Sequence, residues 1–294
     1  MRKSGPSSHS SKARRGASPN NADRPAERVG LIAGNGEFPL RFCDAARQLG
    51  LGVVAVAFAE ETRRDLAAKT DEIHWVSIGQ LGKILRIFRN AGVRRAFMAG
   101  QIRHRRLFSD LKLDFQAVTL LAGLKDKRAD SILRAVADSL GRAGVDVQSS
   151  LPMLKEDVPG PGVLTRRRPN AAQRRDIDFG RAIAKHVAGA DIGQTVVVKN
   201  QSVLAVEAME GTDACLRRGG RFGKGNAVAV KVAKPDQDLR FDVPVIGPRT
   251  IRTLAGSGIA VMAFDAGLTL FIRRAETVSQ ADAAGIVLVG MTGD

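Results

Sequence analysis

Short apolar runs alternate with amphipathic stretches through the first half of the chain. The run Val-Gly-Leu-Ile-Ala-Gly at 29–34 is apolar and ends in glycine, which is typical of a buried strand. The stretch at 79–92 places its apolar residues on one face, which predicts an amphipathic helix. The same patterns predict further strands at 51–58, 73–78, 94–100 and 145–150, and helices at 39–49, 61–69, 114–124 and 129–143. Strands that alternate with helices favour βαβ units, so we expect a Rossmann-like parallel sheet.

The second half of the chain shows a different order of apolar runs. Strands at 195–199 and 202–207 flank Asn200-Gln201, a pair that predicts a short hairpin turn. The remaining patterns predict strands at 228–234, 258–265, 268–274 and 285–290, and helices at 171–188, 212–218, 249–256 and 275–283. Adjacent antiparallel strands and helical connections together indicate a second α/β domain with a mixed sheet.

Breaks in these patterns divide the chain into parts. Residues 1–26 are rich in Ser, Arg, Asn and Pro without apolar periodicity, which indicates a disordered basic tail. The stretch at 152–170 contains four prolines and two glycines, so the domain boundary is expected there. We therefore expect a Rossmann-like domain at 27–158, a Pro/Gly-rich linker at 159–170 and a mixed α/β domain at 171–294 with the catalytic residues.

Charge points to an anionic ligand without identifying it. The formal net charge is +16, and residues 1–28 contribute +5 through seven basic and two acidic residues. Such an excess attracts phosphates, nucleic acid or anionic lipid headgroups, or simply keeps the chain soluble. Aromatic residues make up only 4 % and tyrosine is absent, which counts against an RNA-binding protein that stacks bases on exposed rings.

Cysteine usage and hydropathy indicate a cytoplasmic protein. The two cysteines, Cys43 and Cys215, suggest neither a disulfide framework nor a zinc site. We expect no secretory signal, because the basic N-terminus lacks an apolar core. No stretch approaches the ~20 apolar residues of a membrane span. If the substrate is a lipid, the protein would therefore meet it at the bilayer surface.

Two loops in the first half are candidates for ligand binding. Gly34-Asn35-Gly36 follows a strand and precedes a helix, where backbone N–H groups can bind a phosphate. Pro39 occupies the third position of the dinucleotide fingerprint, so a glycine turn without a ligand remains an alternative. Gln101 and Arg103 follow another parallel strand at the same sheet edge and could bind phosphate or uracil, or belong to a surface loop without a ligand.

Two segments in the second half carry carboxylates and lysines. Glu207, Glu210 and Asp213 lie within seven residues and could offer oxygen ligands to Mg²⁺, although Thr212 or Asp213 could equally serve as a helix cap.

The second of these segments combines basic and acidic side chains. Lys231 and Lys234 could bind a pyrophosphate. Asp242 lies next to an apolar run, where it could bind a metal, activate water or form a turn. The four histidines show no ligand spacing, and the sequence has neither a G-x-S-x-G elbow nor a P-loop lysine motif. Metal-assisted attack by water is the chemistry that these residue types support.

Four segments together resemble the LpxI family of UDP-2,3-diacylglucosamine pyrophosphatases. They are VGLIAGNGEFP, AGQIR, DIGQTVVVKNQSVLAVEAMEGTDACLRR and VKVAKPDQDLRFDVPVIGPRTI, at 29–39, 99–103, 191–218 and 230–251. The resemblance covers nearly everything except the N-terminal tail. It implies two linked domains with the substrate between them.

The resemblance also implies a reaction and a set of residues. Family members convert UDP-2,3-diacylglucosamine and water to UMP and 2,3-diacylglucosamine 1-phosphate (lipid X) in lipid A biosynthesis, with Mg²⁺ or another divalent cation such as Mn²⁺. An essential aspartate of the family corresponds to Asp242. The expected catalytic residues are Asp242 and Asp213, and the expected metal ligands are Asp242, Glu207, Glu210 and Asp213. The expected substrate-binding residues are Gly34, Asn35, Gly36, Gln101, Arg103, Gln194, Thr212, Lys231 and Lys234.

Two other classes of function stay open on the sequence. One is a Rossmann oxidoreductase that uses NAD, against which the missing third glycine counts. The other is a basic module that binds nucleic acid or membrane without catalysis. For the leading hypothesis, the expected partners are the lipid-linked nucleotide sugar and, transiently, the inner-membrane surface. We expect no specific nucleic acid, and homo-oligomerisation stays open.

Overall fold

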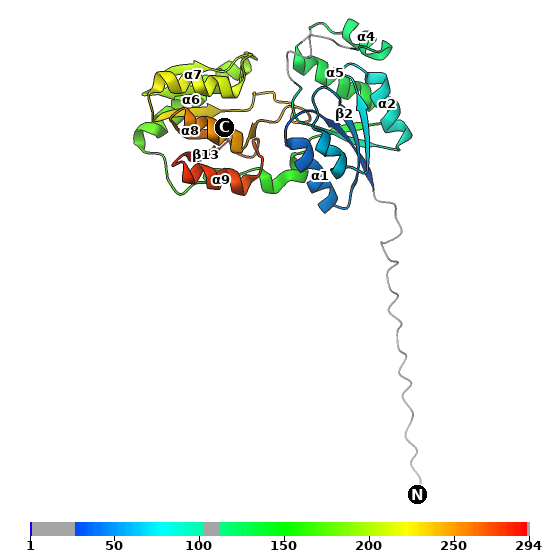
Figure 1. Ribbon diagram of the computed structural model, residues 1–294, viewed down its shortest axis with the longest axis horizontal. Helices are drawn as coiled ribbons and strands as arrows, with labels where there is room; N and C mark the ends of the chain where they lie inside the picture. The colour runs from blue at the N-terminus through cyan, green and yellow to red at the C-terminus, as the bar shows by residue number, and fades with distance from the viewer. Residues whose placement is uncertain (2–26, 103–111, 127, 293–294) are drawn as a thin grey trace.

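The N-terminal domain has a sheet with helices packed around it (Figure 1). Five parallel strands form this sheet, in the order β3-β2-β1-β4-β5. The computed structural model describes residue 1 and residues 27–102, 112–126 and 128–292, so all but the first residue of the predicted tail lie outside it. The strands are β1 (Arg28–Ala33), β2 (Gly52–Phe58), β3 (Glu72–Val76), β4 (Arg95–Ala99) and β5 (Asp146–Gln148). All four neighbouring pairs are parallel. The predicted Rossmann-like parallel sheet is confirmed.

Helices cover both faces of this sheet. They are α1 (Phe38–Gln48), α2 (Leu81–Asn90), α4 (Phe115–Ala122) and α5 (Ala129–Arg142), with short 3₁₀ segments η2 (Arg64–Lys69) and η3 (Leu151–Asp157). On one face Phe42 of α1 packs with Leu31 and Phe97 of the strands. On the other face Phe88 of α2 and Leu140 of α5 belong to a second buried cluster. The apolar faces predicted from helical spacing are the ones that the sheet buries.

The C-terminal domain has a six-stranded mixed sheet, in the order β6-β13-β11-β9-β7-β8. Its strands are β6 (Gly162–Val163), β7 (Thr195–Lys199), β8 (Ser202–Val206), β9 (Ala227–Lys231), β11 (Ile259–Asp265) and β13 (Val287–Met291). Strands β9, β11 and β13 run parallel, whereas β7 is antiparallel to β9 and β6 to β13. The prediction of a second, mixed α/β domain is confirmed.

Four helices enclose the second sheet. They are α6 (Ala171–Gly189), α7 (Thr212–Gly223), α8 (Pro248–Gly256) and α9 (Arg274–Ala283). Ile177 and Ala184 of α6 pack on one face of the sheet, whereas α7, α8 and α9 contribute to the core on the other face. Asn170 caps α6, because its side chain accepts a hydrogen bond from the Gln173 backbone at 2.9 Å.

Local geometry refines several predicted elements. Asn200 and Gln201 have φ values of 50° and 54°, the left-handed pair that a tight hairpin needs, so the predicted turn between β7 and β8 is confirmed. The predicted strand at 268–274 shortens to β12 (Leu270–Phe271), because Arg273 adopts φ 48° and α9 begins directly after it. Strand β6 lies inside the predicted linker at 159–170, where it pairs with β13 at the sheet edge.

The two domains share a hydrophobic contact. Strand β10 (Val245–Ile246) pairs in parallel with β12. Leu270 and Ile272, at β12, are buried in the same cluster as the α1 side chains of the N-terminal domain. On the same side the Arg274 guanidinium donates to the Glu156 carbonyl of η3 at 2.7 Å. Leu239 and Val243, between β9 and β10, also pack against this cluster, so that segment runs along the N-terminal domain.

Candidate functional site between the two domains

The first two predicted loops meet at the carboxyl ends of β1 and β4. The Gly34 backbone N–H donates to the Ala99 carbonyl at 2.8 Å, and the Asn35 N–H donates to the Gln101 carbonyl at 2.9 Å. A Cβ atom on Gly34 would lie 2.7 Å from the Gly100 carbonyl carbon, so this approach requires glycine. The structure thus brings Gly34, Asn35 and Gln101 together, whereas Arg103 lies outside the described residues.

The N-terminus of α1 lies directly behind the first loop. Gly36 has φ +89° and open space around its Cα, and no side chain caps the helix. The Asn35 side chain donates to Glu61 at 2.9 Å, and Glu37 forms an ion pair with Arg273 of the C-terminal domain at 3.0 Å. These carboxylates lie where the sequence predicted a phosphate, so an anion would depend on nearby cations as well as on helix N–H groups.

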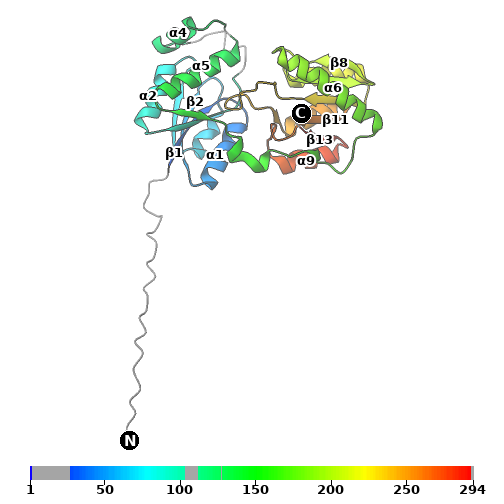
Figure 2. The same ribbon diagram turned by 180° about the vertical axis from the view of Figure 1, so that it is seen from behind.

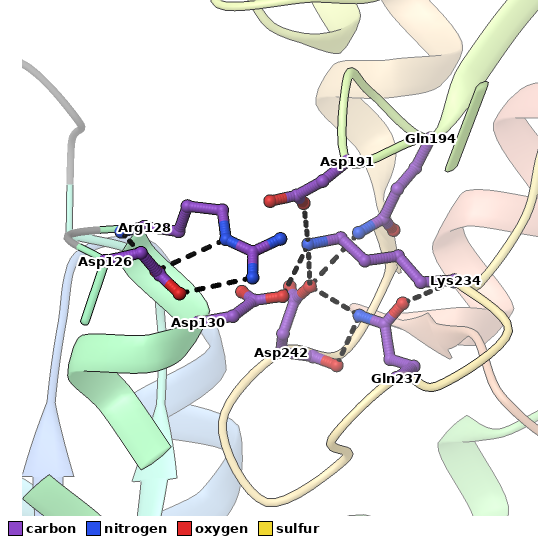
Figure 3. Close-up of polar contacts among 8 residues, drawn as sticks. All are labelled: Asp126, Arg128, Asp130, Asp191, Gln194, Lys234, Gln237 and Asp242. Atoms are coloured by element: carbon purple, nitrogen blue, oxygen red, sulfur yellow. Dashed lines mark hydrogen bonds and ion pairs between the residues drawn. The ribbon is translucent and has the colours of Figure 1, made fainter. Parts of the chain in front are cut away.

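Asp242 lies in a polar cluster where the two domains face each other (Figure 3). Gln194, directly before β7, donates to its Oδ2 atom at 3.1 Å, and Gln237 donates to the same atom at 2.5 Å. Gln237 also donates to the Asp242 backbone carbonyl at 2.7 Å. The side chain keeps 36 % of its surface exposed. Two amides therefore orient a carboxylate that solvent or a ligand can still reach.

Lys234 connects this cluster to the N-terminal domain. Its Nζ atom lies 2.7 Å from Asp130 of α5, 2.5 Å from Asp191 and 4.0 Å from Asp242 (Figure 3). Burial acts to lower the pKa of Lys234, but its hydrogen bonds to Asp130 and Asp191 outweigh this effect and raise the pKa. Lys234 is thus charged and surrounded by three carboxylates from both domains.

The protonation of Asp242 is tuned by the same surroundings. Burial raises the pKa of Asp242 above its ordinary value, because desolvation disfavours the charged form. The Lys234 charge acts in the opposite direction, whereas the Asp130 carboxylate adds to the rise. A carboxylate with a raised pKa in a partly open site has the character of a general base.

A second, more buried cluster lies beside the first. Lys231, at the end of β9, donates to the Thr212 hydroxyl at 3.0 Å and to the Thr195 hydroxyl at 3.3 Å. The Thr212 hydroxyl donates to Glu207 at 2.7 Å, and Lys231 lies 3.8 Å from the other Glu207 oxygen. The Val232 N–H donates to the Gln194 carbonyl at 2.9 Å, which joins this cluster to the Asp242 site.

The predicted metal ligands do not converge. Asp213 forms an ion pair with Arg249 of α8 at 2.7 Å, and Glu210 forms one with Arg218 at 2.5 Å. Glu207 faces Lys231 instead of either of them. Across 27–102, 112–126 and 128–292, no group of three or more His, Cys, Asp or Glu side chains has the geometry of a metal site. Each of these carboxylates, Asp242 with Lys234 included, instead has a basic partner within its own domain.

Sequence reasoning missed five residues of the Asp242 site. Asp130 and Arg128 lie on or next to the start of α5, and Asp126 forms an ion pair with Arg128 at 3.2 Å (Figure 3). Asp191 and Gln237 lie in loops before β7 and after β9. Two of these residues could have been found from their positions in the sequence. Asp191 is three residues before Gln194, and Gln237 lies between Lys234 and Asp242, so both lie inside segments that were already identified.

Neither cysteine offers a covalent route. Both are buried, and burial raises the pKa of each thiol to about 12. Neither thiol would ionise near neutral pH, so neither is an activated nucleophile. This agrees with a reaction in which water attacks.

Comparison with known proteins identifies the family of both domains. The model of the LpxI N-terminal domain matches residues 28–156, and that of the LpxI C-terminal domain matches residues 160–289. The chain belongs to the LpxI family. A curated relative, the UDP-2,3-diacylglucosamine pyrophosphatase LpxI of Caulobacter vibrioides, is 33 % identical over an alignment of 278 residues, which covers 90 % of this chain and 97 % of the relative. The resemblance given by the four sequence segments is confirmed.

Two solved structures are similar to part of the chain. Pyruvate carboxylase from Rhizobium etli aligns with 53 % of this chain and 13 % of its own, with 16 % identity and a TM-score of 0.28. An ADP complex of N5-carboxyaminoimidazole ribonucleotide synthetase aligns with 59 % of this chain and 32 % of its own, with 12 % identity and a TM-score of 0.27. The chain thus spans less than two thirds of either structure, and we base no inference on them.

Proposed function

We propose that this chain hydrolyses the pyrophosphate of UDP-2,3-diacylglucosamine to UMP and lipid X, a step of lipid A biosynthesis. The observation that carries the proposal is membership of the LpxI family across both domains, together with the 33 % identity to a UDP-2,3-diacylglucosamine pyrophosphatase over 97 % of that relative. Neither the NAD-dependent oxidoreductase nor the non-catalytic binding module is favoured by these comparisons. The polar cluster around Asp242 supplies residue types that the reaction needs.

In this proposal Asp242 is the base that activates water. Gln194 and Gln237 both bind its Oδ2 atom, and no hydrogen bond from a described residue reaches Oδ1. As the water oxygen bonds to the sugar-side phosphorus, its proton passes to Asp242. The bond from that phosphorus to the bridging oxygen breaks, and the bridging oxygen leaves with UMP. Asp242 then releases the proton to solvent.

Lys234, Arg128 and Lys231 provide positive charge for the pyrophosphate. Lys234 is 18 % exposed and lies next to Asp242. Arg128 lies beside Asp130 in the same cluster (Figure 3). Lys231 is close enough to lower the pKa of Asp242 by its charge. Fixed cations of this kind stabilise the charge that develops on phosphate oxygens as the bond breaks. Gly34, Gly36 and Gln101 are proposed to bind the nucleotide-sugar from the N-terminal side.

A divalent cation, Mg²⁺ or Mn²⁺, is proposed as cofactor. The carboxylates around Lys234 fit a cation that is held jointly with the substrate, because Mg²⁺ commonly takes one or two carboxylates plus phosphate oxygens. Asp242, with Asp130 or Asp191, would hold it. Its chemistry would be to neutralise phosphate charge. Glu207, Glu210 and Asp213 are engaged elsewhere and are not proposed as its ligands.

The test is direct conversion of the lipid nucleotide. Purified chain is incubated with UDP-2,3-diacylglucosamine, with MgCl₂ or with EDTA, and products are separated by mass spectrometry. We expect UMP and lipid X with MgCl₂ and little product with EDTA. Release of UDP, or no product under either condition, would refute the proposed reaction. Equal rates with MgCl₂ and with EDTA would refute the proposed need for a divalent cation, but not the proposed reaction.

A further inference from the structure

Helix α4 is apolar in sequence, yet the domain leaves it largely uncovered. Six of its eight residues are apolar, in the sequence Phe-Gln-Ala-Val-Thr-Leu-Leu-Ala, and only Ala117 is buried. Helix α2 beside it buries four apolar side chains in the core. Figures 1 and 2 show α4 at the outer edge of the N-terminal domain, beyond α5.

The uncovered side chains lie on one face. Phe115 is 84 % exposed and Val118, one helical turn later, is 49 % exposed. Leu113, just before the helix, is 39 % exposed. Residues at spacing i and i+3 point the same way on a helix, so Phe115 and Val118 form a continuous apolar patch. Phe115 is the most exposed phenylalanine among those that the structure describes, in a protein with few aromatic residues.

Hydrogen bonds to one aspartate tie α4 to α2 in this position. The Asp114 carboxylate accepts from the Ala117 N–H of α4 at 3.0 Å and from the Gly82 N–H of α2 at 2.7 Å. One aspartate thus caps two helices and fixes their relative placement. Leu120 packs against the core on the opposite side. The exposed apolar face therefore belongs to a helix that is packed into the domain.

Basic residues flank the apolar face. Lys83 of α2, Lys112 just before α4 and Lys125 just after it are exposed, and Asp114 is the one acidic residue in the sequence 112–125. Its carboxylate is already engaged as the cap of both helices. An apolar helix face with a basic rim matches the boundary between the acyl chains and headgroups of an anionic bilayer.

We propose that α4 docks the protein onto an anionic lipid bilayer, with Phe115 and Val118 inserted below the headgroups. A second copy of this chain is a poorer fit to the face. Eight residues span about 12 Å of helix, which is too small for the ~800 Å² per partner of a stable interface. The chain runs from α4 through only six residues to α5, which carries Asp130 of the candidate site. Docking here would place the site close to the lipid surface.

This inference extends the proposed function, because a lipid-borne substrate must be met at a bilayer, but its test needs no turnover. The full chain is sedimented with vesicles of phosphatidylcholine and phosphatidylglycerol, and with vesicles of phosphatidylcholine alone. We expect binding to the anionic vesicles that persists in part at high salt. The double variant F115S/V118S should bind about tenfold or more weakly. Leu49, 59 % exposed at the end of α1, gives the matched control L49S, which should bind as the wild type does.

Each alternative outcome is decisive. Unchanged binding by the double variant, or binding that high salt abolishes fully, would overturn insertion by α4. A shift of the wild type to dimers that the double variant lacks, without vesicle binding, would assign the face to a second copy. The melting temperature of each variant checks folding. Hydrolysis of detergent-dispersed substrate should be equal in wild type and double variant, and wild-type vesicle binding without hydrolysis would refute the proposed reaction only.

Discussion

Asp242 is fixed by hydrogen bonds, although the folded protein raises its pKa. Its amide contacts hold it in one orientation, yet its surroundings disfavour its charge. The charged carboxylate therefore lowers the stability of the fold, but a raised pKa suits it to accept a proton. Such a combination is common at functional sites. Asp238, four residues earlier, is the opposite case. Its hydrogen bond to Arg240 lowers the pKa of that carboxyl, so its charge is favoured.

Replacement of Asp242 by Asn should remove the proposed base while keeping its shape. We expect the rate of UMP release to fall about 10²–10⁴-fold, the usual range for loss of a general base. Asp238→Asn lies in the same loop and should retain most of the activity. Comparable rates for wild type and Asp242→Asn would contradict the assigned role.

Asp242→Asn and Asp238→Asn should shift the melting temperature in opposite directions. The folded protein binds the Asp242 proton more tightly than the unfolded chain, so stability from that protonation is lost as pH rises through the raised pKa. At neutral pH, Asp242→Asn should therefore melt a few degrees higher than wild type. Asp238 contributes stability above its unfolded pKa that is lost as pH falls, so Asp238→Asn should melt lower.

Calorimetry with EDTA present checks this prediction, because no bound cation then contributes. At about pH 3, below the ordinary aspartate pKa, the gain from Asp242→Asn should shrink. A lower melting temperature for Asp242→Asn at neutral pH would contradict the raised pKa, because it would mean that the folded protein favours the charged form of Asp242.

At the scale of elements, the two N-terminal loops act as one unit. Gly34 and Gly100 allow the ends of β1 and β4 to touch through their backbones, and a Cβ on Gly100 would lie 2.5 Å from the Asn35 carbonyl oxygen. We expect Gly34→Ala to destabilise the N-terminal domain by about 1–3 kcal/mol, because a backbone neighbour has to move. Gly141→Ala in α5, where a Cβ meets nothing within 4 Å, should be neutral or slightly stabilising.

Urea unfolding of both glycine variants provides the measurement. Equal midpoints for Gly34→Ala and wild type would mean that the two loops separate easily. In that case the first loop would not be a rigid binding surface for the nucleotide-sugar.

Sequence patterns predicted the elements better than the site. Helix α2 and strand β2 followed from apolar spacing, because burial of one face repeats with the period of the element. Asp130 and Lys234 are 104 positions apart, and no local pattern relates them. Glu210 and Asp213 look like metal ligands in sequence, but Glu210 pairs with Arg218 of the helix that follows it. Asp213 pairs with Arg249 because α8 packs beside α7, which spacing alone does not reveal.

At the scale of the whole molecule, the segment after β9 joins the domains. Its Lys234 reaches Asp130, and Val243 packs against the N-terminal core. The Lys234–Asp130 pair is partly exposed, so its contribution is at most about 1 kcal/mol. Asp130→Asn should therefore increase hydrogen exchange of the amides at 236–242 by up to about fivefold.

Asp65→Asn is the matched control, because it removes an exposed ion pair, Arg63–Asp65, within one domain. It should leave exchange at 236–242 unchanged. High salt should reproduce part of the Asp130→Asn effect in the wild type. Identical exchange in Asp130→Asn and wild type would mean that the hydrophobic contact alone holds the domains together.

The central claim is that water, activated at Asp242, cleaves the pyrophosphate at the sugar-side phosphorus. Hydrolysis of UDP-2,3-diacylglucosamine in ¹⁸O-labelled water tests it most directly, since the label marks the phosphorus attacked. We predict ¹⁸O in the phosphate of lipid X, none in UMP, and almost no labelled product from Asp242→Asn. Label in UMP, or equal labelling by Asp242→Asn, would contradict this account.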